Sequence, residues 1–171
     1  GKSYLQLKQY PEALQELLAY AEKAEPSETL HSALLDILDA SYRLEDMAAI
    51  GSALNRFAAL YPEDPQLPKG YLCKALLHQK NCQYASARVL FEEIRSVFPE
   101  SPECQTALFE QLHLDFHEKR WEECRTLCQN YIGSFPDSDR ASYAWRLLSA
   151  ASSNLSLESG TDAAREQLAS D

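Results

Sequence analysis

Apolar residues recur along this chain at a fixed interval of 37 residues. Six sets of positions share the interval, and every member of each set is apolar or aromatic. The sets are Tyr10, Met47, Tyr84 and Trp121; Ala13, Ile50, Ala87 and Cys124; Leu17, Leu54, Phe91 and Cys128; Tyr20, Phe57, Ile94 and Tyr131; Ala24, Tyr61, Phe98 and Phe135; and Leu34, Tyr71, Leu108 and Trp145. Self-similarity at such a period predicts one supersecondary unit repeated along the sequence.

Within a unit the apolar spacing is helical. Tyr84, Ala87, Phe91 and Ile94 are separated by 3, 4 and 3 residues, which is one face of an α-helix. A second stripe lies upstream, and the polar segment QKNCQ between the two stripes predicts a tight turn. A Phe-Pro or Tyr-Pro pair closes the second stripe, because the residue before proline is pushed out of the α region. Each unit is therefore predicted to be a helical hairpin, helix A followed by helix B.

The pattern predicts an all-α protein, an α-solenoid of about 3.5–4 stacked antiparallel hairpins with a C-terminal capping helix. The repeat domain covers 1–155 and is followed by a polar tail, 156–171, expected to be mostly flexible with a short helix over 161–169. The repeats are 1–26, 27–63, 64–100 and 101–137, with the cap over 138–155. The expected helices are 1–8, 10–24, 29–44, 47–60, 68–80, 84–97, 103–118, 121–134 and 139–155. The chain is interpreted as a fragment of a longer protein.

Composition excludes several classes of partner. The 171 residues suffice for one domain with a real core, and hydrophobic residues make up 45% of them. The net charge of −10 argues against a nucleic-acid surface, because phosphates require Lys and Arg. No apolar run approaches the roughly 18 residues of a membrane helix, so no membrane insertion by this chain is expected. The cysteines are odd in number, which disfavours a disulfide scaffold and predicts free thiols: Cys73, Cys82, Cys104, Cys124 and Cys128.

Two constellations invite a catalytic or metal-binding interpretation. Ser41, His78 and Asp115 share one repeat register and supply the three residue types of a hydrolase triad, but equivalent positions on stacked hairpins lie roughly 10 Å apart. A triad requires contacts near 3 Å. His113 and His117 could join Cys124 and Cys128 as four zinc ligands, yet both cysteines fall on core positions. The prediction is therefore no enzyme, no cofactor and no metal.

The repeat resembles the tetratricopeptide repeat (TPR) family. That family's unit places large, small, aromatic and proline residues at set positions of the hairpin. The third unit matches with Tyr71, Ala75, Tyr84, Ala87, Phe91 and Pro99, and the fourth with Leu108, Leu112, Trp121, Cys124, Cys128 and Pro136. The interval of 37 departs from the family's usual period of about 34. Leu38, Leu112 and Ile50 stand where small residues are typical, so a looser approach of the helices is expected.

The phrase from Ala87 to Ser101 is similar to divergent bacterial TPR proteins of the cell envelope. Examples are the periplasmic protein that partners the Tol–Pal system and the TPR lipoprotein of the outer-membrane assembly machine. This resemblance implies a periplasmic or cell-envelope location. The five free cysteines favour a cytoplasmic alternative, so the compartment stays open.

In such a fold the helix A faces line the concave side, where a peptide or a helix of a partner protein would bind. The candidate partner-binding residues are Leu35, Asp39, Tyr42, Arg43, Leu72, Leu76, Gln79, Phe109, His113, Phe116, Tyr143 and Arg146. Whether this face is an open groove or is buried by packing stays undecided. Only Arg43, Lys80 and Arg146 could clamp a C-terminal carboxylate, and Asp39 opposes them, so a carboxylate clamp is disfavoured.

The expected function is a non-catalytic scaffold or adaptor for protein–protein interaction. Two alternatives stay open: a regulatory or docking arm of an enzyme encoded N-terminal to the chain, and a TPR chaperone for a secretion substrate. A homodimer through the exposed first helix B is a further alternative. The partner's identity does not follow from the sequence.

Overall fold

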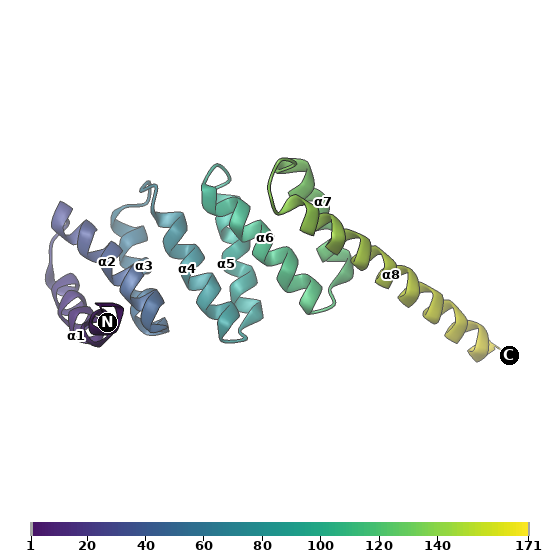
Figure 1. Cartoon of the computed structure of the whole chain (residues 1–171), viewed down its shortest axis with the longest axis horizontal. Helices are drawn as coiled ribbons and strands as arrows, with labels where there is room; N and C mark the ends of the chain where they lie inside the picture. Colours follow the sequence, from purple (N-terminus) through teal and green to yellow (C-terminus); the bar gives the residue numbers. More distant parts are fainter. Residues whose placement is uncertain (1, 171) are drawn as a thin grey trace. The chain divides into compact units, whose positions relative to one another are not determined.

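The computed structural model describes the backbone of residues 2–170 and the side chains of residues 10–159. This part of the chain forms eight α-helices joined by short turns (Figure 1). They are α1 Lys2–Lys23, α2 Glu28–Leu44, α3 Met47–Leu60, α4 Leu67–Lys80, α5 Tyr84–Val97, α6 Pro102–His117, α7 Trp121–Ser134 and α8 Ala141–Ser170. The helices pack in sequential antiparallel pairs, which confirms the predicted all-α class. The bounds of α3, α5 and α7 are those that the sequence predicts.

The chain divides into two compact units, Gly1–Glu103 and Cys104–Asp171. In the first unit, helices α1 to α4 share a core whose fully buried members include Phe57, Leu34, Ile37, Ile50 and Leu54. Each of these side chains contributes about 1.5–3 kcal/mol by leaving water. Helix α5 packs against α4, and its Phe91 and Ile94 are fully buried.

The second unit has its own core, formed by α6, α7 and α8. Leu112, Cys124, Cys128 and Tyr131 are fully buried there, together with Ala144 of α8. Helix α7 is tied to α6 by the Cys124 thiol, which donates to the Leu112 carbonyl over 3.4 Å. The indole N–H of Trp121 donates to Glu158 over 2.8 Å, and this bond joins the start of α7 to α8.

The same turn ends three helices at intervals of 37 residues. Glu45, Cys82 and Lys119 all adopt the left-handed conformation, with φ between 57° and 59°. After α2, the Glu45 amide donates to the Tyr42 carbonyl and the next amide, that of Asp46, donates to the Ser41 carbonyl. The other two turns repeat both bonds at the corresponding positions. This pair of bonds is the Schellman motif, and it reverses the chain so that the next helix runs antiparallel.

The predicted closing residues of helix B also repeat as backbone geometry. The amides of Tyr61, Phe98 and Phe135 each donate to the carbonyl four residues earlier, over 2.8–2.9 Å. Ala24 makes the corresponding bond to Tyr20 over 3.0 Å. The aromatic rings then close the hairpins: Tyr71 meets Phe98 with ring centroids 5.8 Å apart. The interval read from the side chains is therefore also the interval of the backbone.

The two ends of the chain differ from the predicted helices. The sequence predicts a break between 1–8 and 10–24, but α1 is one helix, Lys2–Lys23, that continues through Pro11. Its first half therefore does not fold back on its second half as a hairpin partner. Accordingly Ala13 is exposed and Tyr20 is 41% exposed, although their counterparts Ile50 and Phe57 are fully buried. At the other end, α8 does not stop at 155 but runs to Ser170.

A small residue allows the first unit to accommodate Leu38. The sequence predicts that this leucine loosens the helix approach, but a Cβ placed on Gly70 of α4 would lie 3.2 Å from its Cδ1 atom. The same Cβ would lie only 2.9 Å from Cδ1 of Leu54. Thus α4 approaches α2 and α3 closely at Gly70, and the expectation is wrong at this position. The positions equivalent to Gly70 are also small and buried: Ala33, Ala107 and Ala144.

Gly70→Val is expected to destabilise the protein by about 1–3 kcal/mol, because its branched side chain has no room between Leu38 and Leu54. Gly51→Val on α3 is the matched control, since nothing lies within 4 Å of a Cβ there. The control is expected to be close to neutral. Urea denaturation followed by circular dichroism measures both, and equal losses would contradict the close approach.

Lys119→Gly is expected to stabilise the protein by about 0.5–1 kcal/mol, because glycine adopts the left-handed conformation without a Cβ penalty. Lys119→Val is expected to destabilise it, since a β-branched residue is strained there. The two variants remove the same charge, so their difference reports backbone strain. Thermal denaturation measures the melting temperatures, and a higher value for the valine variant than for the glycine variant would refute the left-handed conformation at this turn.

Candidate functional site

In the second unit the predicted helix A residues form an aromatic face between α6 and α8. Tyr143 of α8 lies over two residues of α6: its ring centroid is 5.7 Å from that of Phe109 and 6.0 Å from that of His113. The His113 and Tyr143 rings are nearly parallel, with 20° between their planes. The Arg140 guanidinium lies over the Phe109 ring, 4.7 Å from its centroid, in cation–π geometry. The sequence thus predicted a set of side chains that does converge within this unit.

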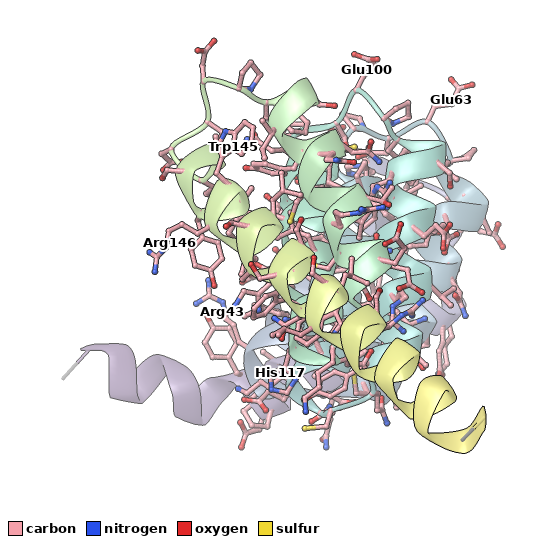
Figure 2. All side chains as sticks on the ribbon, turned by 90° about the vertical axis from the view of Figure 1, so that its right-hand side faces the viewer. Arg43, Glu63, Glu100, His117, Trp145 and Arg146 are labelled. Atoms are coloured by element: carbon pink, nitrogen blue, oxygen red, sulfur yellow. The ribbon has the colours of Figure 1, made fainter. Side chains whose placement is uncertain are left out.

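A cleft of about 510 Å³ continues this face. Phe116 of α6 lines it together with Tyr143, Arg146, Leu147, Ser149 and Ala150 of α8. Among the described residues, Arg146 has no hydrogen bond or ion pair, and its side chain extends away from the helix (Figure 2). The site therefore combines half-buried aromatic rings with one unpaired cation at its edge.

The first unit has a smaller cleft, of about 50 Å³, between α2 and α4. Leu35 and Asp39 line it from α2, as predicted for the helix A face. From α4, however, the lining residues are Lys69, Gly70 and Cys73, with Gln66 before the helix. Leu72, Leu76 and Gln79 lie half-buried outside this cleft. The cleft therefore lies about one position around α4 from the predicted residues, whose role as partner contacts stays a prediction.

Of the other predicted residues of α2, Arg43 is paired with Asp39 and Tyr42 is exposed. Arg43 donates to the Asp39 carboxylate over 2.7 Å, and this bond, followed by the charge of Asp39, raises the pKa of Arg43. The Arg43 guanidinium also lies 5.9 Å from the centroid of the Tyr10 ring. Tyr42 is exposed on the same helix.

Two of the three cations considered for a carboxylate clamp are therefore already paired. Arg43 is engaged by Asp39, and Lys80 forms an ion pair with Glu45. Both pairs are exposed, so each adds little to stability, but each lowers the positive charge offered to an anionic ligand. This pairing is a physical argument against recognition of a C-terminal carboxylate in the first unit.

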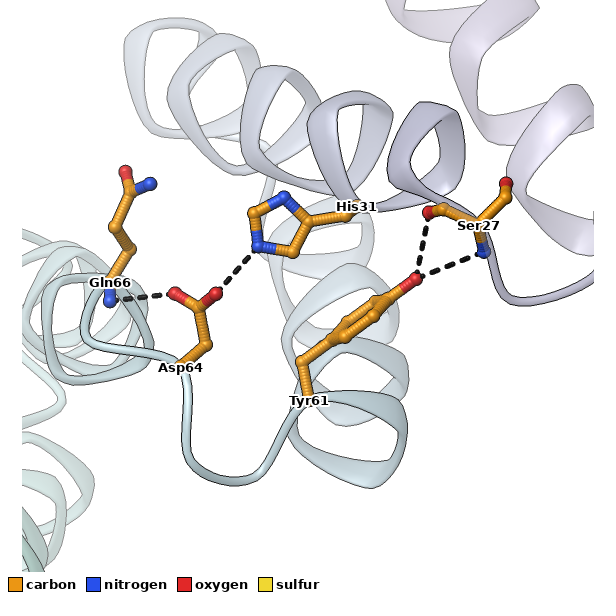
Figure 3. Close-up of polar contacts among 5 residues, drawn as sticks. All are labelled: Ser27, His31, Tyr61, Asp64 and Gln66. Carbon is orange, nitrogen blue, oxygen red and sulfur yellow. Dashed lines mark hydrogen bonds and ion pairs between the residues drawn. The ribbon is translucent and has the colours of Figure 1, made fainter.

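A polar network that the sequence analysis missed joins the start of α2 to the loop after α3 (Figure 3). His31 Nε2 and Asp64 Oδ2 are 2.6 Å apart, and the other Asp64 oxygen accepts the Gln66 amide over 2.8 Å. The Tyr61 hydroxyl donates to the Ser27 carbonyl over 2.9 Å and accepts the Ser27 amide over 3.3 Å. The edge of the His31 ring meets Tyr61 with centroids 5.0 Å apart.

The second unit has the equivalent contact, 74 residues further along the chain. Gln105, at the start of α6, donates from Nε2 to the Ser138 hydroxyl over 3.0 Å and to the Tyr131 hydroxyl over 3.2 Å. His31 with Asp64 and Gln105 with Ser138 are thus equivalent side-chain pairs, which we call junction bonds. The signal in the sequence was polarity at matching positions, and an argument restricted to apolar positions could not find it.

Two of the groups that the sequence considered for a triad, Ser41 and His78, lie in the first unit, and the third, Asp115, is buried in the second. His78 bonds Gln83 at 2.6 Å, whereas Ser41 is fully buried on α2. Cys124 and Cys128 are fully buried with their sulfurs 3.9 Å apart. Among the described residues no cluster of three or more His, Cys, Asp or Glu side chains has a metal-binding arrangement.

No family model matches the sequence, and a search of curated proteins finds no significant match. Along the part of the chain that the structure describes, none of the helices has the length and apolar character needed to span a membrane. The fold and the two clefts define the class: an all-α protein of sequential helix pairs that presents helix A side chains in each unit.

The thiols are expected to differ sharply in reactivity. The pKa of Cys124 is raised, first by its hydrogen bond with Cys128 and then by burial, so the thiolate fraction of Cys124 is reduced at any given pH. Cys82 is exposed in the turn after α4. In the native protein a disulfide reagent is expected to label the exposed Cys82 first, and the buried Cys124 only after unfolding. Mass spectrometry of timed samples, with Cys82→Ser as control, checks this order.

Proposed function

We propose that this chain is a TPR-like α-solenoid that acts as a non-catalytic scaffold and binds a peptide or a helix of a partner protein on its helix A faces. The observation that carries the proposal is the α6–α8 face, where Phe109, His113 and Tyr143 stack beside a cleft edged by Arg146. Aromatic and arginine side chains dominate the energetics of protein interfaces. A binding role therefore fits both the geometry and the residue types.

The repeated backbone supports the solenoid part of the proposal. Turns with equal φ and equal hydrogen bonds recur at Glu45, Cys82 and Lys119. Helix pairs that are equivalent to this degree bury their apolar stripes by stacking on their neighbours. The resemblance to TPR proteins accords with the small, buried set of Ala33, Gly70, Ala107 and Ala144.

The charges favour a partner with a neutral or acidic group at the α6–α8 face. Arg146 is unpaired among the described residues, and Arg140 already lies over the Phe109 ring. One free cation beside aromatic rings suits a single acidic or polar side chain next to an apolar anchor. In the first unit Arg43 and Lys80 are already paired with carboxylates, so we place the principal anchor in the second unit.

Tyr143→Ala combined with Arg146→Glu is expected to reduce partner capture at least tenfold, because it removes an aromatic anchor and reverses the free charge. A photo-crosslinking residue placed at position 149, on the wall of the same cleft, identifies what binds there. The crosslinking residue is placed at position 149 of the otherwise wild-type chain and of the double variant. Mass spectrometry then quantifies the partner that each captures in an extract of the source organism.

The control combines Tyr20→Ala with Lys119→Glu, which removes an exposed tyrosine and makes the same charge change elsewhere. Circular dichroism shows whether each variant keeps its helices. Equal capture by the two double variants would refute the α6–α8 face as the binding surface. A crosslinked product that is a small substrate rather than a protein would favour a different class of function.

A further inference from the structure

A second surface lies at the loop end of the first unit and shares no residue with either helix A cleft. It is a cleft of about 570 Å³ between the loop that precedes α4 and the loop that follows α5. Five of its lining residues are prolines: Pro62, Pro65, Pro68, Pro99 and Pro102. We call it the proline cleft.

The proline cleft occupies a position where the other junctions are closed by a side-chain bond. The junction bonds join His31 to Asp64 and Gln105 to Ser138. At the matching positions of the α4–α5 pair the chain has Pro68 and Ser101. Proline has no side-chain donor or acceptor, so a junction bond cannot form there. Pro68 and Ser101 instead line the proline cleft.

The lining is mostly apolar and is poor in backbone donors. Proline carries no backbone N–H, so five prolines remove five donors from the walls. Val97 and Phe98 add apolar surface, and Val97 is 58% exposed, which is unusual for an aliphatic residue beside other apolar groups. Flat pyrrolidine rings around an open cleft suit the face of an aromatic side chain, which buries a large apolar area at a low entropy cost.

The rim of the proline cleft is acidic. Glu63 lies on one loop and Glu100 on the other, and Figure 2 shows both carboxylates pointing away from the helices at this end of the unit. Both residues are exposed. The third acid, Asp64, is engaged by His31 and by the Gln66 amide. Two carboxylates facing solvent on opposite loops attract cations that flank whatever fills the cleft.

We propose that the proline cleft binds a linear segment of a partner protein in which an aromatic residue is flanked by Lys or Arg. The aromatic ring enters between the prolines, and the two cations pair with Glu63 and Glu100. This is a second docking surface, additional to the helix A faces, and its ligand has the opposite charge preference to that proposed for the α6–α8 face. A scaffold with both surfaces can hold two different segments at once.

The probe is the blocked peptide Ac-GRWRG-NH2, titrated into the full chain by calorimetry at low salt, where exposed charges are least screened. Two peptides are controls: Ac-GEWEG-NH2 reverses the flanking charges, and Ac-GRGRG-NH2 lacks the aromatic ring. We expect binding of the first peptide and at least tenfold weaker binding of each control. Amide resonances of residues 63, 64 and 66 and of residues 97, 98, 100 and 101 are expected to shift on binding in 1H–15N spectra.

Two variants locate the site. Glu63→Lys with Glu100→Lys is expected to lower the affinity for the probe peptide at least tenfold. Glu12→Lys with Glu16→Lys makes the same charge change at exposed positions of α1 and is expected to change that affinity less than twofold. Pro68→Gln places an amide where Gln105 stands in the second unit, opposite Ser101, and is expected to close the cleft and weaken binding at least fivefold.

Three outcomes would overturn the proposal. They are no binding of the probe by the wild-type chain, equal affinity for the probe and its charge-reversed control, and equal loss in the loop and α1 charge variants. Circular dichroism verifies that Pro68→Gln is folded; if it is not, the loop charge variant decides alone. The α6–α8 variants leave the proline cleft unchanged. A failure of partner capture at the α6–α8 face is therefore distinguishable from a failure of the proline cleft to bind the probe peptide.

Discussion

The structure depends on one backbone constraint, the left-handed residue that ends each helix A. Glu45, Cys82 and Lys119 hold φ near 58°, a conformation that costs a residue other than glycine roughly 1–2 kcal/mol. Two amide-to-carbonyl bonds across each turn offset that cost by satisfying carbonyls that a helix end leaves unpaired. Because the turn fixes where helix B begins, it also fixes which side chains of the two helices meet. The interval of 37 residues in the core is a consequence of keeping this turn in register.

The loop ends of the helix pairs are under a looser constraint, and there the chain varies. One junction uses an imidazole and a carboxylate, another an amide and a hydroxyl, and the third has Pro68 and Ser101. All three keep the same backbone bond from the aromatic closing residue, at Tyr61, Phe98 and Phe135. The backbone therefore does not require a junction bond, and the side chains at these positions are free to serve other purposes.

Much of the fold could be predicted because the core is periodic. The steps of 3, 4 and 3 between Tyr84 and Ile94 place α5 within its observed bounds, and the fully buried Phe91 and Cys128 sit at equivalent positions. The prediction failed where the unit is incomplete: α1 continues through Pro11, which lies in the interior of this helix and not in its first turn. On the helix A face, Phe109, His113 and Tyr143 were found because aromatic size is visible in a sequence. Lys69 and Cys73 were missed because the side of α4 that meets α2 is set by the close approach at Gly70, a packing detail that spacing alone does not give.

The proline cleft was also missed, because the sequence analysis followed periodic core positions and this cleft is lined mostly by residues outside them. Its prolines lie in loops or in the first turn of a helix, outside every set of core positions, and in the sequence they first appear to be punctuation that marks helix ends. Pro62 and Pro99 do keep the interval of 37 and do follow helix ends, as punctuation requires. Pro68 and Pro102 are in the first turns of α4 and α6, where proline is favoured, and Pro65 lies in the loop before α4. The proposed docking surface therefore depends on the apolar opening that all five prolines line and on the lack of a junction bond at Pro68, and not on the presence of proline at helix ends.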